Sequence, residues 1–108
     1  MSTLKFYIRH QNNFLRDKFI LVFKSEEAKS FFEQSIEGCY FEELTKEQAQ
    51  HAARIGINGK VIPYGYTYRL TDEEMTRLSS HNWDETAELL AEGNERLYKE
   101  LKEKGKEA

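Results

Sequence analysis

The sequence predicts an α+β fold, in which a small antiparallel sheet is packed on one face by three to four helices and the last helix is long. Three observations lead to this expectation. Residues 3–10 alternate between apolar and polar side chains, which is the pattern of a half-buried strand. Capping boxes that begin at Thr45 and Thr71 mark helix starts. Strands and helices do not alternate in long βαβ units, which favours a sheet made of an N-terminal hairpin and a later hairpin.

The N-terminal hairpin is predicted from the first two apolar segments. Residues 18–24 are apolar on both faces, as expected of a central strand. The polar segment 11–13 supplies turn residues between this strand and residues 3–10. The two segments are therefore expected to pair.

The first helix is predicted to follow this hairpin directly. Ser25 is a favourable N-cap, and the carboxylates of Glu26 and Glu27 interact well with the positive end of a helix dipole. Gly38 stands where a left-handed residue commonly ends a helix. Residues 39–41 are then consistent with a short strand.

A second helix and a second hairpin are predicted in the middle of the chain. Thr45 and Gln48 have the spacing of a capping box, in which each side chain satisfies the other residue's backbone N–H. Small residues on one side of this helix indicate close packing: Ala49, Ala52 and Ala53. Asn58-Gly59 is typical of a type I′ turn, and residues 60–70 are interpreted as a long strand that follows it.

Two helices are predicted to complete a single domain over residues 1–104. The first is short, over residues 72–79, and begins with the capping box at Thr71. Asn82 is a suitable N-cap for the last helix, over residues 83–104. Its apolar side chains approximate heptad spacing, so the helix packs over its own sheet or forms a homodimer seam. Residues 105–108 are expected to form a loose tail.

Composition excludes several classes of protein. With 108 residues the chain is long enough for one domain, and a 13% aromatic share supplies anchors for a core. A single cysteine, Cys39, argues against a disulfide scaffold, and no apolar run has the length of a membrane span or the character of a signal peptide. We therefore expect a cytoplasmic protein. A net charge of −3 does not by itself indicate a nucleic-acid or membrane ligand.

A candidate binding face comes from the way charge is distributed. Residues 1–24 hold five basic side chains and one acidic one, and residues 51–70 hold three basic and none acidic, whereas the predicted helices are mostly acidic. The expected strand over residues 60–70 also presents a row of tyrosines, a residue type common at binding hot spots. The predicted partner-binding residues are Tyr64, Tyr66, Tyr68, Arg69, Lys5, Tyr7 and Arg9. Strand charges also pair across an exposed sheet, and tyrosines also fill cores, so a purely structural role stays open.

Catalytic and metal-binding patterns are not found in the sequence. Cys39 has no local signature of a catalytic nucleophile around it. The three histidines, at positions 10, 51 and 81, lack the paired spacing of metal ligands. The six glycines form neither a phosphate-binding loop nor a dinucleotide fingerprint. We therefore predict neither an enzyme, nor a cofactor, nor a metal site.

The function favoured by these observations is binding of another protein. The hypothesis is a small adaptor or inhibitor, in its finest form a phage or mobile-element accessory protein that blocks a host defence nuclease. That last step is an association with small acidic domains of this style rather than a derivation. The alternative is single-stranded nucleic-acid binding, in which basic strands neutralise phosphates and tyrosines stack on bases.

Overall fold

Three antiparallel strands form the sheet at the centre of the fold. The computed structural model describes residues 4–11, 18–35, 38–57, 59–65, 67–78 and 82–106. The strands β1 (Lys5–Gln11), β2 (Ile20–Phe23) and β3 (Cys39–Leu44) stand in the order β2-β1-β3. The predicted α+β class, the antiparallel sheet and the N-terminal hairpin are confirmed. The short strand expected at 39–41 is longer and occupies one edge of the sheet.

Helices cover both faces of this sheet, not one as the sequence suggested. On one face, Phe6 and Ile8 of β1 pack against α2 (Lys46–Arg54). On the other face, Tyr7 packs against α1 (Glu26–Ser35) through Phe32. All four residues of β2 are buried, so this strand contributes to the apolar core on each side. A strand that is apolar on both faces requires a second covering layer, because its exposed face would otherwise remain in water.

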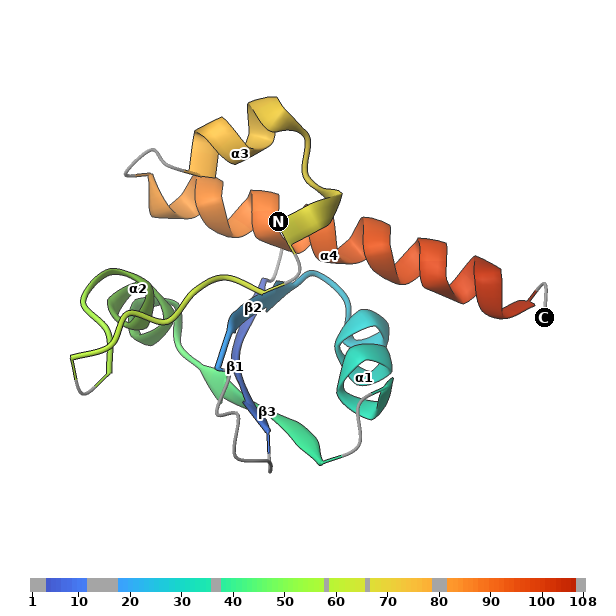
Figure 1. Cartoon of the computed structure of the whole chain (residues 1–108), viewed down its shortest axis with the longest axis horizontal. Coiled ribbons are helices and arrows are strands. Elements are labelled where there is room, and N and C mark those ends of the chain that lie inside the picture. The colour runs from blue at the N-terminus through green and yellow to red at the C-terminus, as the bar shows by residue number, and fades with distance from the viewer. Residues whose placement is uncertain are drawn as a thin grey trace.

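The last helix, α4 (Trp83–Lys106), joins the two sides. It passes along the β2 side of the sheet, and its C-terminal end projects beyond α1 (Figure 1). Leu90 lies in the core beside α2, and Leu97 lies in the core beside α1. The apolar stripe that was predicted as a possible dimer seam is thus largely used inside the same chain. The helix also continues through Gly105 and Lys106, which were expected in the loose tail, and basic residues there suit the negative end of its dipole.

Residues 60–70 are not the long strand that their alternation predicts. Contact with the sheet is limited to a parallel bridge at Ile20, whose N–H donates to the Pro63 carbonyl oxygen and whose carbonyl accepts from Gly65. Pro63 has no N–H with which to extend a ladder. The chain then forms a short 3-10 helix, η1 (Thr67–Arg69). The predicted later hairpin exists only as a bridge between Ile57 and Lys60, outside the sheet.

The short helix α3 (Asp72–Leu78) is held mainly by polar contacts, because none of its residues is buried. Both bonds of the predicted capping box form, between Thr71 and Glu74. Arg96 of α4 donates from Nη1 and Nη2 to the two Glu74 carboxylate oxygens, at 2.8 and 2.9 Å. These bonds, followed by the bond from the Thr71 backbone, lower the pKa of Glu74 to about 2. Glu74 therefore links the start of α3 to the middle of α4.

We expect Glu74→Gln to reduce the free energy of unfolding by about 1–2 kcal/mol at pH 7. The pKa of Glu74 is lower in the folded state than its ordinary 4.5, so its contribution is present above pH 4.5 and is lost as the pH falls toward 2. Urea unfolding at pH 7 and pH 3 measures this, and the gap between the native chain and the variant should narrow at pH 3. Glu73→Gln is the control, since Glu73 pairs only with Arg77 on the same helix. A gap of equal size at both pH values contradicts the assignment.

Candidate functional site

The predicted binding residues of β1 do not form an exposed face. Tyr7 is 4% exposed and its ring packs against those of Phe23 and Phe41. Arg9 is 8% exposed, and its guanidinium carbon lies 4.5 Å from the centre of the Phe19 ring. Only Lys5 is exposed, and its ammonium group lies 3.4 Å from a carboxylate oxygen of β3. The expectation of a basic, tyrosine-bearing sheet surface is therefore wrong for Tyr7 and Arg9, which the α1 layer covers.

The other predicted binding residues are placed apart from β1. Tyr64 is half-buried against Trp83, with ring centres 6.4 Å apart, and burial raises the pKa of its hydroxyl. Arg69 forms a two-bond pair with Glu100 of α4, at 2.7 and 2.9 Å. Tyr68 is in η1, where only its backbone is described, and Tyr66 lies outside the described residues. Tyr64 and Arg69 thus hold segment 60–70 against the body of the domain, and their part in partner binding stays a prediction.

The polar residues near β3 do not form an activated nucleophile. Burial raises the pKa of the Cys39 thiol, which disfavours the thiolate, and the nearby Arg9 charge offsets this only in part. His10 Nε2 lies 2.7 Å from Glu42 Oε1, and the His10 ring stacks on Tyr40 at 4.8 Å. Among the described residues, no group of three or more His, Cys, Asp and Glu side chains is placed to hold a metal ion. Across the same ranges, none of the helices combines the length and apolar content of a membrane span.

Exposed aliphatic side chains gather after the end of α2. Ile55 is 66% exposed, Ile57 41% and Val61 52%. We call these three residues the isoleucine patch. The two other large apolar residues that are comparably exposed, Tyr40 and Met75, belong to different elements. Three such residues within seven positions give the described surface its densest run of exposed aliphatic groups.

Backbone hydrogen bonds fix the segment that carries the patch. The carbonyl of His51 accepts from Ile55 and from Gly56, at 2.8 and 3.0 Å. Ile57 and Lys60 exchange two hydrogen bonds across the turn, at 2.9 and 3.1 Å. The next residue, Ile62, donates to a carbonyl of α2 and is buried in the core. The segment is therefore tied to α2 at both ends, and it lies beside that helix in Figure 1.

Gly56 makes this arrangement possible. Its φ of +97° is left-handed, a region that L side chains rarely adopt. A Cβ at this position would lie 2.4 Å from both the carbonyl carbon and the oxygen of Lys60. The two arms of the turn can therefore approach this closely only with glycine here.

A groove adjoins the patch and extends it. Its volume is about 360 Å³, which lies near the lower end of the range for ligand pockets. Ile57 forms part of its wall, so the groove and the patch are continuous. The rest of the wall comes from the end of β3 and one side of α2: Leu44, Glu47, Gln48, His51 and Ala52. The groove is wide enough for one or two aliphatic side chains and too small for a folded domain.

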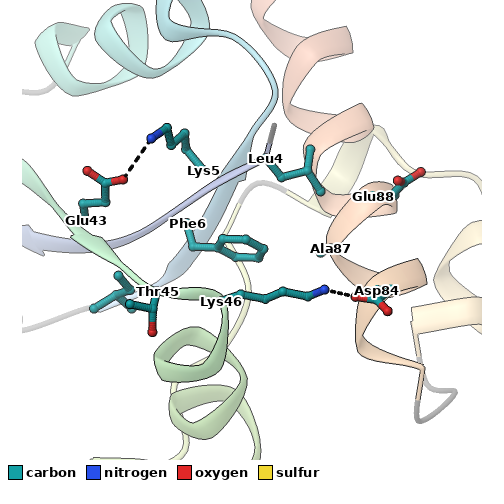
Figure 2. Close-up of a pocket in the computed structure, with 10 residues that line it drawn as sticks. Leu4, Lys5, Phe6, Glu43, Thr45, Lys46, Asp84, Ala87 and Glu88 are labelled. Atoms are coloured by element: carbon teal, nitrogen blue, oxygen red, sulfur yellow. Dashed lines mark hydrogen bonds and ion pairs between the residues drawn. The ribbon is translucent and has the colours of Figure 1, made fainter. Parts of the chain in front are cut away.

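A larger hollow, of about 590 Å³, lies between the start of β1, the β3–α2 junction and α4 (Figure 2). Its rim carries two ion pairs that connect different elements. Lys5 pairs with Glu43 across the sheet, and Lys46 of α2 pairs with Asp84 of α4. The ring of Phe6 lies between the two pairs (Figure 2). Because both lysines already have carboxylate partners, this hollow explains how the elements are joined more directly than it indicates a ligand.

The sequence did contain a signal for the patch. Ile55 and Ile57 flank a glycine and precede an Asn-Gly turn, so they were interpreted as strand residues of a hairpin. A hairpin that pairs with no third strand leaves one side of its short arms in water. The pattern of residues alone does not reveal whether such a third strand is present.

Comparison of the chain with models of protein families, with curated proteins and with solved structures finds no match in any of the three. The functional argument therefore rests on the geometry of the chain itself.

Proposed function

We propose that this chain is a non-enzymatic protein-binding module of the adaptor or inhibitor type, and that it binds its partner through the isoleucine patch and the adjoining groove. The observation that carries the proposal is the exposure of Ile55, Ile57 and Val61 on a turn whose backbone is fixed. Full burial of one such side chain contributes about 1.5–3 kcal/mol. A contiguous apolar surface beside a groove is typical of a docking site.

The chemistry of the patch favours a protein partner over a single-stranded nucleic acid. Binding of bases without sequence preference depends on exposed aromatic rings and a cationic groove. Here Tyr7 is buried and Tyr64 is half-buried, whereas the exposed side chains are aliphatic and have no π-face on which to stack. Aliphatic groups bind well to the aliphatic and aromatic side chains of another protein.

The finer form of the proposal is inhibition of a host defence nuclease by a phage or mobile-element accessory protein. Its support is the small size and acidic balance of the chain, and identification of the captured partner tests it.

Replacing Ile55 and Ile57 together by serine is expected to reduce partner capture at least about tenfold. The loss of two aliphatic contacts removes more than the 1.4 kcal/mol that corresponds to a factor of ten. The measurement is affinity capture by the tagged full-length chain from a bacterial lysate, with and without nuclease treatment, quantified by mass spectrometry. Because both side chains are exposed, the melting temperature should change little.

Met75→Ser is the matched control, since Met75 is 43% exposed and lies on α3, outside the patch. A protein retained by the native chain and by Met75→Ser, and lost with the double variant, supports the proposal. Equal capture by all three chains refutes it. Partners that disappear after nuclease treatment indicate binding through nucleic acid instead.

A further inference from the structure

Resting on the proposed function, we propose that the part of the partner that occupies the isoleucine patch is a short amphipathic segment. This segment carries large apolar side chains for the patch and groove, and carboxylates at one end that face Lys60 and Arg54. The inference follows from the charges around the patch, from their order along α2 and from the size of the apolar surface.

Basic side chains surround the patch on the side of the turn. Residues 51–70 contain three basic and no acidic residues. Two of the basic residues, Arg54 and Lys60, are exposed next to the patch, whereas Arg69 is paired with Glu100. Arg54 and Lys60 therefore present positive charge to whatever covers the aliphatic side chains.

Lys60 differs from the lysines near the sheet. Lys5, Lys24, Lys29 and Lys46 each form an ion pair with a carboxylate of the same chain. Lys60 forms no ion pair with any residue that the structure describes. An exposed cation at the border of an apolar surface favours partners with a carboxylate at the matching position.

The order of charges along α2 gives the site a direction. Glu47 lies in the first turn of α2 and lines the groove, and Arg54 is the last residue of the helix. Seven residues of helix separate them by roughly 10 Å. A bound segment that carried carboxylates at both ends would place one of them near Glu47. The segment that fits best is therefore acidic only at the end near Arg54 and Lys60.

The size of the patch favours a short segment over a second copy of the chain. Three aliphatic side chains provide roughly 200–400 Å² of apolar surface at about 25 cal/mol per Å². Even small specific protein interfaces bury about 600 Å² on each partner. A second copy would offer attraction through the acidic hollow between α3 and α4, which contains Asp84, Glu85, Glu88 and Glu92. The oligomeric state distinguishes the two occupants.

The test is selection from a random twelve-residue peptide library displayed on phage, with the immobilised full-length native chain as bait. Peptides that also bind Ile55→Ser/Ile57→Ser are removed. The expected result is enrichment of peptides with large apolar residues and with Asp or Glu at one end. Peptides selected on the native chain should bind Lys60→Glu about fivefold more weakly, because an attraction becomes a repulsion. Lys104→Glu, the same charge change near the end of α4, should leave binding unchanged.

Each other outcome overturns this inference. Enriched peptides without acidic residues, or equal affinity for the native chain and Lys60→Glu, remove the charge argument. Failure to enrich any peptide removes the short segment. A dimer in solution that dissociates in Ile55→Ser/Ile57→Ser makes a second copy the occupant. In all these cases the proposed function stands if capture from the lysate depends on the patch, and it falls only if capture does not.

Discussion

Asn94→Asp is expected to destabilise the folded chain by about 3–5 kcal/mol at pH 7, the largest effect of any single change considered. Asn94 is 0% exposed, in the middle of α4. Its side-chain nitrogen donates to the carbonyl oxygen of Val22 in β2 at 2.8 Å. A carboxylate here would face that oxygen with no proton to donate, and no described donor reaches the Oδ1 position of Asn94. An uncompensated buried charge is among the most destabilising substitutions.

The loss of stability in Asn94→Asp should depend on pH. Burial raises the pKa of the introduced carboxyl above its unfolded value of about 3.9, so the folded state favours the protonated acid. The deficit relative to the native chain is therefore small at pH 3.5 and grows as the pH rises above about 4. The protonated acid can donate to the Val22 oxygen as the amide does. Chemical unfolding of both chains at pH 3.5 and pH 7 measures the deficit.

Asn94→Ala is the control that separates charge from packing. It removes the same hydrogen bond and leaves a cavity, at a cost of about 2–3 kcal/mol that does not vary with pH. An Asn94→Asp variant that is as stable as the native chain at pH 7 would show that water reaches this position. In that case the α4–β2 contact would be looser than its geometry indicates.

The features predicted correctly from the sequence depend on interactions between neighbours in the chain. The capping boxes at Thr45 and Thr71 form as expected, because each requires only two residues three positions apart. Asn82 likewise accepts a hydrogen bond from the Glu85 N–H at the start of α4. The strand over residues 3–10 is also local in origin, since its alternation sets which side chains share a face.

The features predicted incorrectly depend on contacts between distant segments. The period-two pattern in residues 60–70 is genuine, but a strand also needs a neighbour with free hydrogen-bonding groups. Only Ile20 of β2 exchanges backbone bonds with this segment, through Pro63 and Gly65. At Gly65 a Cβ would lie 2.5 Å from a methyl carbon of Leu21, so the approach to β2 requires glycine. Neither fact can be deduced from the segment itself.

The candidate site was missed because residue type does not reveal burial. Tyr7 and Arg9 are amphipathic, and α1 covers the face on which they lie. Ile55 and Ile57 are apolar and were assigned to a hairpin, whereas their turn lies at the edge of the domain. A helix over one sheet face and the lack of one over a turn are both tertiary facts. The sequence therefore indicated a protein-binding module more readily than it located the surface involved.

Gly56→Ala is expected to reduce the free energy of unfolding by about 2–4 kcal/mol and to abolish partner capture together. A left-handed φ costs an alanine about 1–2 kcal/mol. The contact of its Cβ with Lys60, at 2.4 Å, adds about 1–3 kcal/mol of overlap unless the turn opens. Opening breaks the hydrogen bonds between Ile57 and Lys60 and moves Ile57 and Val61 away from each other. Urea unfolding and lysate capture measure the two effects.

Gly59→Ala isolates the contribution of the close approach. Gly59 also has a left-handed φ, of +79°, but a Cβ there meets nothing within 4 Å. Its substitution should therefore cost about 1–2 kcal/mol from backbone strain alone and leave capture nearly intact. If the two variants lose capture equally, the patch depends on the flexibility of the turn rather than on the packing of Gly56 against Lys60. If Gly56→Ala loses stability but still captures the partner, then Ile55 alone, on the α2 side of Gly56, carries the interaction.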